Sequence, residues 1–192
     1  LYISRRLGRG QLDHTLIQPL PLWLALATEG LNPFTGGSKL LAGVVLLVWA
    51  TLRLHLVVSV PWLALLLVNL AASAAVVLAF SFLCGSLAFW APRAAEEISD
   101  SAVTLLDQLR VFPLDGLSAA LQVGLLMAVP AGLVAWLPCR YLLGLERAPW
   151  GALAAPLAAL AFTALALVFF VKGWRHYGRV GSHRYSSFGH RS

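Results

Sequence analysis

Residues 54–92, LHLVVSVPWLALLLVNLAASAAVVLAFSFLCGSLAFWAP, form a run of 39 residues without Asp, Glu, Lys or Arg. Two further charge-free runs of 24 residues each cover 116–139 and 148–171. About 20 apolar residues in a helix, rising about 1.5 Å each, cross the roughly 30 Å hydrocarbon core of a bilayer. A water-soluble core does not explain three such runs, so the sequence predicts an integral membrane protein that crosses the bilayer several times.

The composition supports the same class. Of the 192 residues, 59% are hydrophobic and 11% are charged, whereas soluble domains carry about 25% charged residues. The net charge of +6 would suit nucleic acid, but the basic residues lie between and after the apolar runs, as they do on a cytoplasmic membrane face. We therefore expect no nucleic-acid partner. Cys84 and Cys139 lie in or beside predicted spans and form no CxxC pair, which argues against a disulfide framework or a zinc site.

The hydrophobic pattern predicts an all-α, polytopic helical bundle with a transmembrane domain over 40–171. The segment before it, 1–39, is expected to be cytoplasmic and amphipathic, and 172–192 is expected to form a basic cytoplasmic tail. Between the second and third spans, 91–115 is expected to form an amphipathic cytoplasmic helix. The four expected spans cover about 40–58, 62–90, 117–137 and 152–171.

The distribution of Lys and Arg predicts the orientation. The segments 1–39, 91–115 and 172–192 together carry 11 of the 14 Lys and Arg residues. The opposite side carries the other three, Arg53, Arg140 and Arg147. Because cytoplasmic loops are enriched in Lys and Arg, both ends of this chain are expected to face the cytoplasm.

The sequence shows no group of residues with catalytic or metal-binding spacing. The sequence has no GxxxxGK[ST] loop, no HExxH and no GxSxG. We therefore expect no catalytic residue, no metal site and no nucleotide hydrolysis by this chain itself.

A few polar or helix-breaking residues inside the spans are candidates for a substrate path. Arg53 is the charged residue within a proposed span. Intramembrane charge suggests function, with His55 as its companion, although Arg53 could instead extend to the headgroups. Asn69 and Ser73 are four residues apart and share a helix face, which suits either packing or substrate contact. Pro130 is expected to kink the third span, either as a hinge or as a static bend.

Small residues are dense at 71–75 and 152–166. They let helix backbones approach closely in a bilayer, so these two segments are expected to pack in a helical bundle.

Four motifs resemble those of a known family. The segment GRGQLDHTLIQPL, residues 8–20, is followed by Gly85…Phe89-Trp90, by a Pro-Leu then Val-Pro-Ala then Pro…Leu-Leu-Gly stretch over 113–144, and by a closing Trp174…Tyr177…Gly181. In this order they resemble bacterial ABC-2 type transporter permeases of the DUF990-like kind. Gly178 and Arg179 depart from that pattern, because a serine is commoner there. The residues that carry the resemblance are Gly10, Leu12, Asp13, Leu16, Pro19, Leu20, Gly85, Phe89, Trp90, Pro113, Leu114, Pro130, Ala131, Pro138, Leu142, Leu143, Gly144, Trp174, Tyr177 and Gly181.

The resemblance implies a six-span permease half in the bacterial cytoplasmic membrane, of which this chain would hold the last four spans. It implies a second permease, as a homodimer or heterodimer, and two copies of an ABC ATPase subunit. ATP and Mg would be bound by that ATPase, with no cofactor on this chain. A coupling helix within 4–24 would dock on the ATPase through Arg9, Gly10, Leu12, Asp13, Leu16 and Pro19; the alternative for this segment is an interfacial anchor.

The function implied is ATP-driven export of an amphipathic or hydrophobic substrate. Two alternatives remain open. One is a non-catalytic scaffold subunit of a larger membrane complex. The other is a membrane-embedded lipid-modifying enzyme, which would need acids or histidines such as Asp115, Glu146 and His55 to converge.

Overall fold

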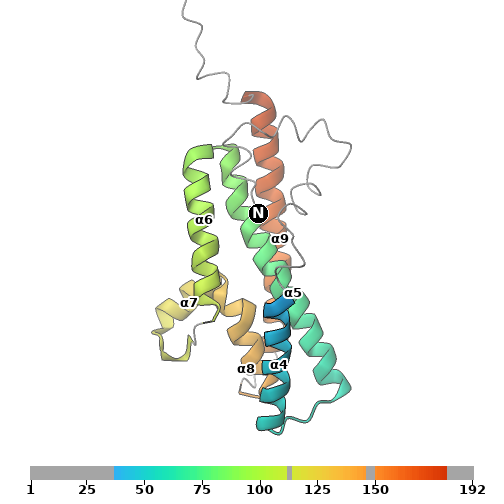
Figure 1. Ribbon diagram of the computed structural model, residues 1–192. Coiled ribbons are helices and arrows are strands. Elements are labelled where there is room, and N and C mark those ends of the chain that lie inside the picture. Colours follow the sequence, from blue (N-terminus) through green and yellow to red (C-terminus); the bar gives the residue numbers. More distant parts are fainter. Residues whose placement is uncertain (1–36, 112–113, 146–149, 181–192) are drawn as a thin grey trace, which may run out of the picture.

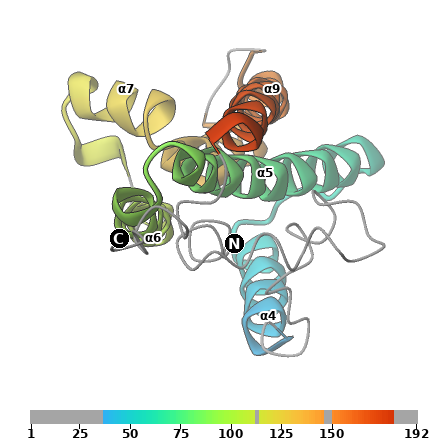
Figure 2. The same cartoon turned by 90° about the horizontal axis from the view of Figure 1, so that it is seen from above.

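The computed structural model describes residues 37–111, 114–145 and 150–180, and every regular element in these ranges is a helix (Figure 1). Helix α5 and helix α9 lie side by side and form the centre of the molecule, α6 lies beside one end of α5, and α4 lies on the side of α5 opposite α9 (Figure 2). The elements are α4 (Gly37–Arg53), α5 (Val60–Ser86), η1 (Leu87–Phe89), α6 (Pro92–Leu109), η2 (Leu114–Gly116), α7 (Ala119–Met127), the π-helix η3 (Gly132–Trp136), α8 (Leu137–Leu142) and α9 (Trp150–Val180).

Helix α5 begins where the sequence supplies a helix start. Ser59 has extended backbone angles, and its hydroxyl accepts a hydrogen bond from the backbone N–H of Trp62 at 3.4 Å. Pro61 occupies the first turn, where its missing N–H costs nothing and its fixed φ favours the helix. No charged residue interrupts the helix before Phe89, so α5 and η1 together make an apolar rod of 30 residues, about 45 Å long.

Helix α9 is the second long apolar rod. It begins at Trp150 and ends at Val180, and therefore extends well beyond the predicted span 152–171. The first residues of the predicted basic tail, 172–180, continue the same helix. Residues 181–192 lie outside the described part of the chain.

Small side chains hold α5 and α9 together. Ala72 and Val76 of α5 pack against Ala155 and Ala159 of α9, and all four are buried. A helix pair in lipid gains little from the hydrophobic effect, so close backbone approach and van der Waals contact must supply the attraction. The prediction that the alanine-rich segments 71–75 and 152–166 pack closely is confirmed.

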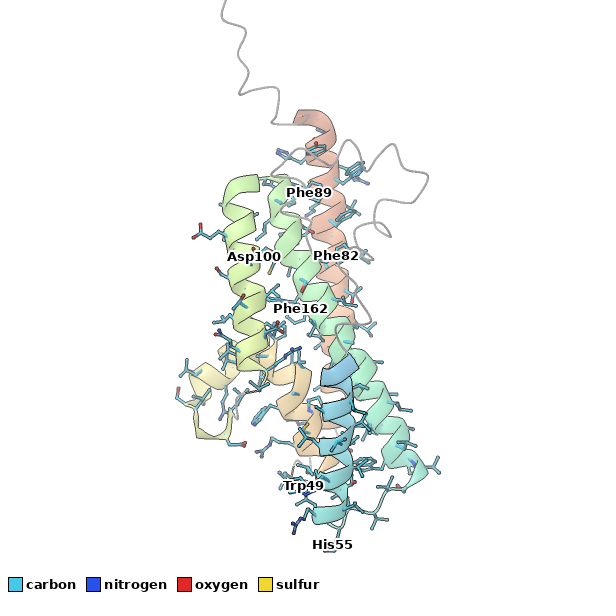
Figure 3. All side chains as sticks on the ribbon, in the orientation of Figure 1. Trp49, His55, Phe82, Phe89, Asp100 and Phe162 are labelled. Carbon is cyan, nitrogen blue, oxygen red and sulfur yellow. The ribbon has the colours of Figure 1, made fainter. Side chains whose placement is uncertain are left out.

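Aromatic side chains continue this contact toward the C-terminal ends of both helices. Phe80 meets Phe162 edge to face with ring centroids 6.2 Å apart, and Phe89 meets Phe170 at 5.5 Å in a similar geometry. Figure 3 shows Phe82, Phe89 and Phe162 in sequence along the contact. Phe89 also packs on Ala95 of α6, so the turn after α5 is fixed against both neighbours.

Helix α6 covers 92–109 of the segment 91–115 and matches the expected amphipathic pattern in part, because Ile98 and Leu105 are exposed. Ala95, Ser99 and Leu106 are buried, whereas Glu97 and Asp100 are exposed, and Figure 3 shows Asp100 projecting away from α5. Leu106 packs with Phe80 and Cys84 of α5. The helix therefore lies alongside the last third of α5.

Two helices are long and apolar enough to cross a membrane, Val60–Phe89 and Trp150–Arg179. The pair Ala119–Met127 and Gly132–Leu142 makes a third if it is counted as one bent span. Helix α4 is apolar but shorter, and its apolar side chains from Leu41 to Leu52 are mostly exposed. The described part of the chain thus gives an all-helical protein with two to three candidate spans, and the predicted number of four stays a prediction.

The contact between Gly173 and Phe89 makes a sharp test of the α5–α9 packing. A Cβ atom added at Gly173 would lie 2.8 Å from Cγ and 2.9 Å from Cβ of Phe89, which is 1% exposed. We expect Gly173→Ala to lower stability by about 1–3 kcal/mol, because overpacking must displace the buried ring. The measurement is the thermal midpoint in detergent. Gly178→Ala is the matched control, because a Cβ there meets nothing within 4 Å; equal midpoints for the two variants would contradict the packing.

Candidate functional site

The third predicted span, 117–137, is broken rather than straight. Helix α7 and the segment Gly132–Leu142 meet at an angle of 87°. Pro130 lies in the break and is fully buried; it has no N–H for the helical ladder and its ring clashes with the preceding turn. A π-helix, Gly132–Trp136, follows immediately, and proline and π-bulges are the usual causes of sharp helix kinks. The kink expected at Pro130 is therefore confirmed.

The inside of the bend is closely packed. A Cβ at Gly132 would lie 2.7 Å from a methyl carbon of Leu114 and 2.8 Å from one of Leu126, so glycine lets both leucines close over the backbone. Next to it, Ala131 packs with Phe80 and Cys84 of α5. The bend is thus seated against the rigid α5–α9 pair.

Polar contacts join the two sides of the break. The carboxylate of Asp115 in η2 accepts a hydrogen bond from Nε1 of Trp136 at 3.0 Å and forms an ion pair with the guanidinium of Arg140. The guanidinium also lies over the Trp136 ring, 5.1 Å from its centroid. Trp136 and Arg140 are one helical turn apart, which puts both on the face toward Asp115. We call Asp115, Trp136 and Arg140 the polar clasp.

Sequence reasoning did not find the polar clasp. The charge count assigned Asp115 to the cytoplasmic side and Arg140 to the opposite side of the membrane, yet the two side chains are in contact. This contact is possible because the intervening segment turns back on itself at the break instead of crossing directly. The sequence feature that could have indicated the polar clasp is the spacing of Trp136 and Arg140, which share one helix face and follow Pro130.

The structure separates the candidates for a substrate path. Asn69 and Ser73 are both buried on α5; the side-chain N–H of Asn69 donates to the carbonyl of Leu65 at 2.9 Å, while its Oδ1 has no hydrogen-bond partner. Arg53 is the last residue of α4 and is exposed, with its guanidinium 5.7 Å from the Trp49 ring centroid. Its position at a helix C-terminus favours the cation. Pro130 lies at the break between α7 and η3.

The alternative of a lipid-modifying site gains no support from the described residues. Asp115 is held in the polar clasp, and His55 lies in the turn after α4, at the end of the molecule marked in Figure 3. Glu146 lies outside the described ranges, as do the coupling candidates Arg9, Gly10, Leu12, Asp13, Leu16 and Pro19. Within 37–111, 114–145 and 150–180, no group of three His, Cys, Asp or Glu residues could hold a metal ion.

This arrangement combines a straight helix pair with a bent segment packed against it. A rigid pair of long helices lies beside a segment that is bent at a proline and closed by polar contacts. Elements with two packed arrangements of similar energy are what rigid-body transitions require. The polar clasp spans the break, so it holds η2 against η3 and α8.

A double-mutant cycle tests the polar clasp. We expect Asp115→Asn and Arg140→Gln each to lower the thermal midpoint in detergent, and the double variant to be less destabilised than the two effects added. Coupled pairs give about 0.5–3 kcal/mol; the lower part of this range is expected, because the Asp115 side chain is 55% exposed.

The control is Asp107→Asn, which removes an exposed ion pair with Arg110 within one turn of α6. This change is expected to have little effect, because exposed pairs contribute little. Additive effects of Asp115→Asn and Arg140→Gln, or an equal loss at Asp107, would refute the coupling across the break.

Comparison with known proteins identifies the family. The family model described as ABC-2 family transporter protein matches residues 1–181, which is nearly the whole chain and includes every element described above. No curated protein and no solved structure matches. The resemblance inferred from the four sequence motifs is confirmed by this match. The chain belongs to the ABC-2 family of transporter membrane proteins.

Proposed function

We propose that this chain is the permease subunit of an ATP-driven exporter that moves an amphipathic or hydrophobic substrate across the bacterial cytoplasmic membrane. The observation that carries the proposal is the family match over 1–181. The apolar spans and the bent segment beside the α5–α9 pair agree with it, because such a permease must change shape around its cargo without performing chemistry itself.

Membership of the ABC transporter family implies an ATPase partner. We extend this to two ATPase copies and a second permease, identical or different, with ATP and Mg bound by the ATPase. The apolar face of α4 is open to such a partner, because Leu46, Trp49 and Leu52 are each more than half exposed. Lipid or a second permease would have to cover this surface.

The proposed orientation places both ends of the chain in the cytoplasm. Lys172, Arg175 and Arg179 occupy the last turns of α9, whereas Arg53 and Arg140 lie toward the opposite end of the molecule. That end is marked by the hydrogen bond from Nε1 of Trp62, at the start of α5, to the carbonyl of Leu142 at 3.1 Å. The excess of cations at the α9 end supports its cytoplasmic placement.

We further propose that the segment containing Arg9, Gly10, Leu12, Asp13, Leu16 and Pro19 docks on the ATPase. A rigid amphipathic helix there would transmit ATPase closure to the spans as rigid-body motion. The apolar side chains would enter a groove of the partner, and Asp13 would fix the register. An interfacial anchor remains the other reading of this segment.

Co-purification tests the proposal against the scaffold alternative. The tagged chain, extracted in mild detergent, is expected to bring down a protein with a Walker A motif, and transport by the reconstituted complex is expected to require ATP. Partners that include other membrane proteins but no ATPase would favour the scaffold. Unchanged activity after deletion of that ATPase would refute the exporter.

Substitution in the docking segment tests coupling. Asp13→Ala and Leu16→Ala are expected to leave membrane insertion intact while reducing transport per ATP hydrolysed by at least several-fold, because the contact that transmits closure is weakened. The readout is the ratio of substrate flux to phosphate release in proteoliposomes. Val57→Ala is the control, since Val57 is 85% exposed in the turn between α4 and α5, at the far end; a wild-type ratio in both docking variants would place the docking site elsewhere.

A further inference from the structure

One face of α9 changes from apolar to cationic within a single turn. Spacings of three and four residues place side chains on the same face of a helix. Leu165, Val168 and Phe169 occupy this face and are 48%, 47% and 38% exposed. One turn later the same face continues with Lys172, Arg175, His176 and Arg179. We call this surface the α9 stripe.

The cationic part of the α9 stripe borders a pocket. Lys172, Arg175, His176, Arg179 and Trp90 line an open surface pocket of about 340 Å³. Trp90 forms one wall: its ring is stacked on His176, with centroids 6.1 Å apart, and it meets Phe169 edge to face at 6.3 Å. The pocket therefore joins an aromatic wall to the apolar part of the stripe.

The positive charge of this pocket is not neutralised by the described part of the chain. Within the described ranges the ion pairs are Arg110 with Asp107 and Arg140 with Asp115. Neither pair involves α9. Glu97, Asp100 and Asp107 of α6 are exposed on their own helix; Asp100 is labelled in Figure 3. Three permanent cations within two turns repel one another, and an anion between them would remove that cost.

The position along the helix identifies the kind of anion. Lys172 follows directly after the charge-free run 148–171. The part of this run that lies in α9, 150–171, is about 33 Å long at about 1.5 Å per residue, which is enough to cross the roughly 30 Å hydrocarbon core. Trp90 and Trp174 lie at the same level, and tryptophan is enriched at headgroup depth. This position predicts that the pocket lies near the depth of lipid phosphates, with the exposed apolar side chains Leu165, Val168 and Phe169 next to it on the side of the candidate span.

We propose that the α9 stripe binds an anionic phospholipid of the adjacent leaflet. The phosphate occupies the pocket between Lys172, Arg175 and Arg179, and an acyl chain lies along Phe169, Val168 and Leu165. Clusters of Lys and Arg next to a span attract anionic lipids, with a contribution from each residue. Headgroup binding at this point would fix the end of α9 that packs on Phe89, independently of any transported substrate.

Lipid binding is measured by native mass spectrometry of the full-length protein in detergent, titrated with phosphatidylglycerol or phosphatidylcholine. Wild type is expected to bind phosphatidylglycerol at least tenfold more tightly. The variant Lys172→Gln/Arg175→Gln/Arg179→Gln is expected to lose this preference while still eluting as a folded species. Arg53→Gln, which removes an exposed cation at the other end of the molecule, is the control and should retain it.

Two further measurements distinguish the occupant. Glycerol 3-phosphate carries the phosphate without acyl chains and is expected to compete at least tenfold more weakly than the lipid; equal competition would overturn the lipid assignment in favour of a soluble phosphate. The single variant Arg175→Gln is expected to reduce the preference for phosphatidylglycerol severalfold. It provides a check that is independent of the triple variant. Retention of the full preference by the triple variant, or no preference in wild type, would overturn the proposal. Since no transport is measured, these outcomes are separate from those that test the exporter.

Discussion

The contact between α5 and α9 through small side chains is the interaction on which the remaining packing depends. Ala72, Val76, Ala155 and Ala159 are buried against one another, and larger residues at these positions would hold the two backbones apart. In a bilayer the surroundings of a helix are as apolar as its neighbour, so association must come from close contact. Once the rods are aligned, the phenylalanine pairs and the turn at Phe89 have fixed surfaces against which α6 and the bend can pack.

The bend at Pro130 illustrates how a membrane protein accommodates a broken helix. Every backbone polar group freed in an apolar environment must find another partner, and here the π-helix after the break and the turn bonds before it supply several of them. Leu114 packs over the backbone at Gly132, and the polar clasp adds contacts between the two sides of the break. A charged pair near a span is costly to bury, and partial exposure of Asp115 and Arg140 reduces that cost.

The two ends of the molecule have different physical characters. At one end, Arg53 and Arg140 each lie over a tryptophan ring, so their charges are already engaged within the chain. At the other end, the cations of α9 line an open pocket with Trp90 and have no carboxylate partner in the described ranges. This asymmetry links the orientation of the chain to the proposed lipid site, because both depend on the same cluster of charge. The proposed export function depends on neither, since it derives from family membership.

The sequence alone determined the class, the family and much of the span pattern. The length of the apolar runs predicts that 62–90 and 152–171 lie in long helices. The density of alanine indicates which two segments pack closely, and a proline inside a span indicates a kink. These are local properties, because they follow from side-chain volume, hydropathy and the proline ring. The tertiary structure decided the size of the bend, the contact between Asp115 and Arg140, the continuation of α9 to Val180 and the meeting of Trp90 with the cations of that helix. Each of these joins residues far apart in the chain or depends on a neighbouring helix as support, and the spacing of residues along a sequence does not encode such contacts.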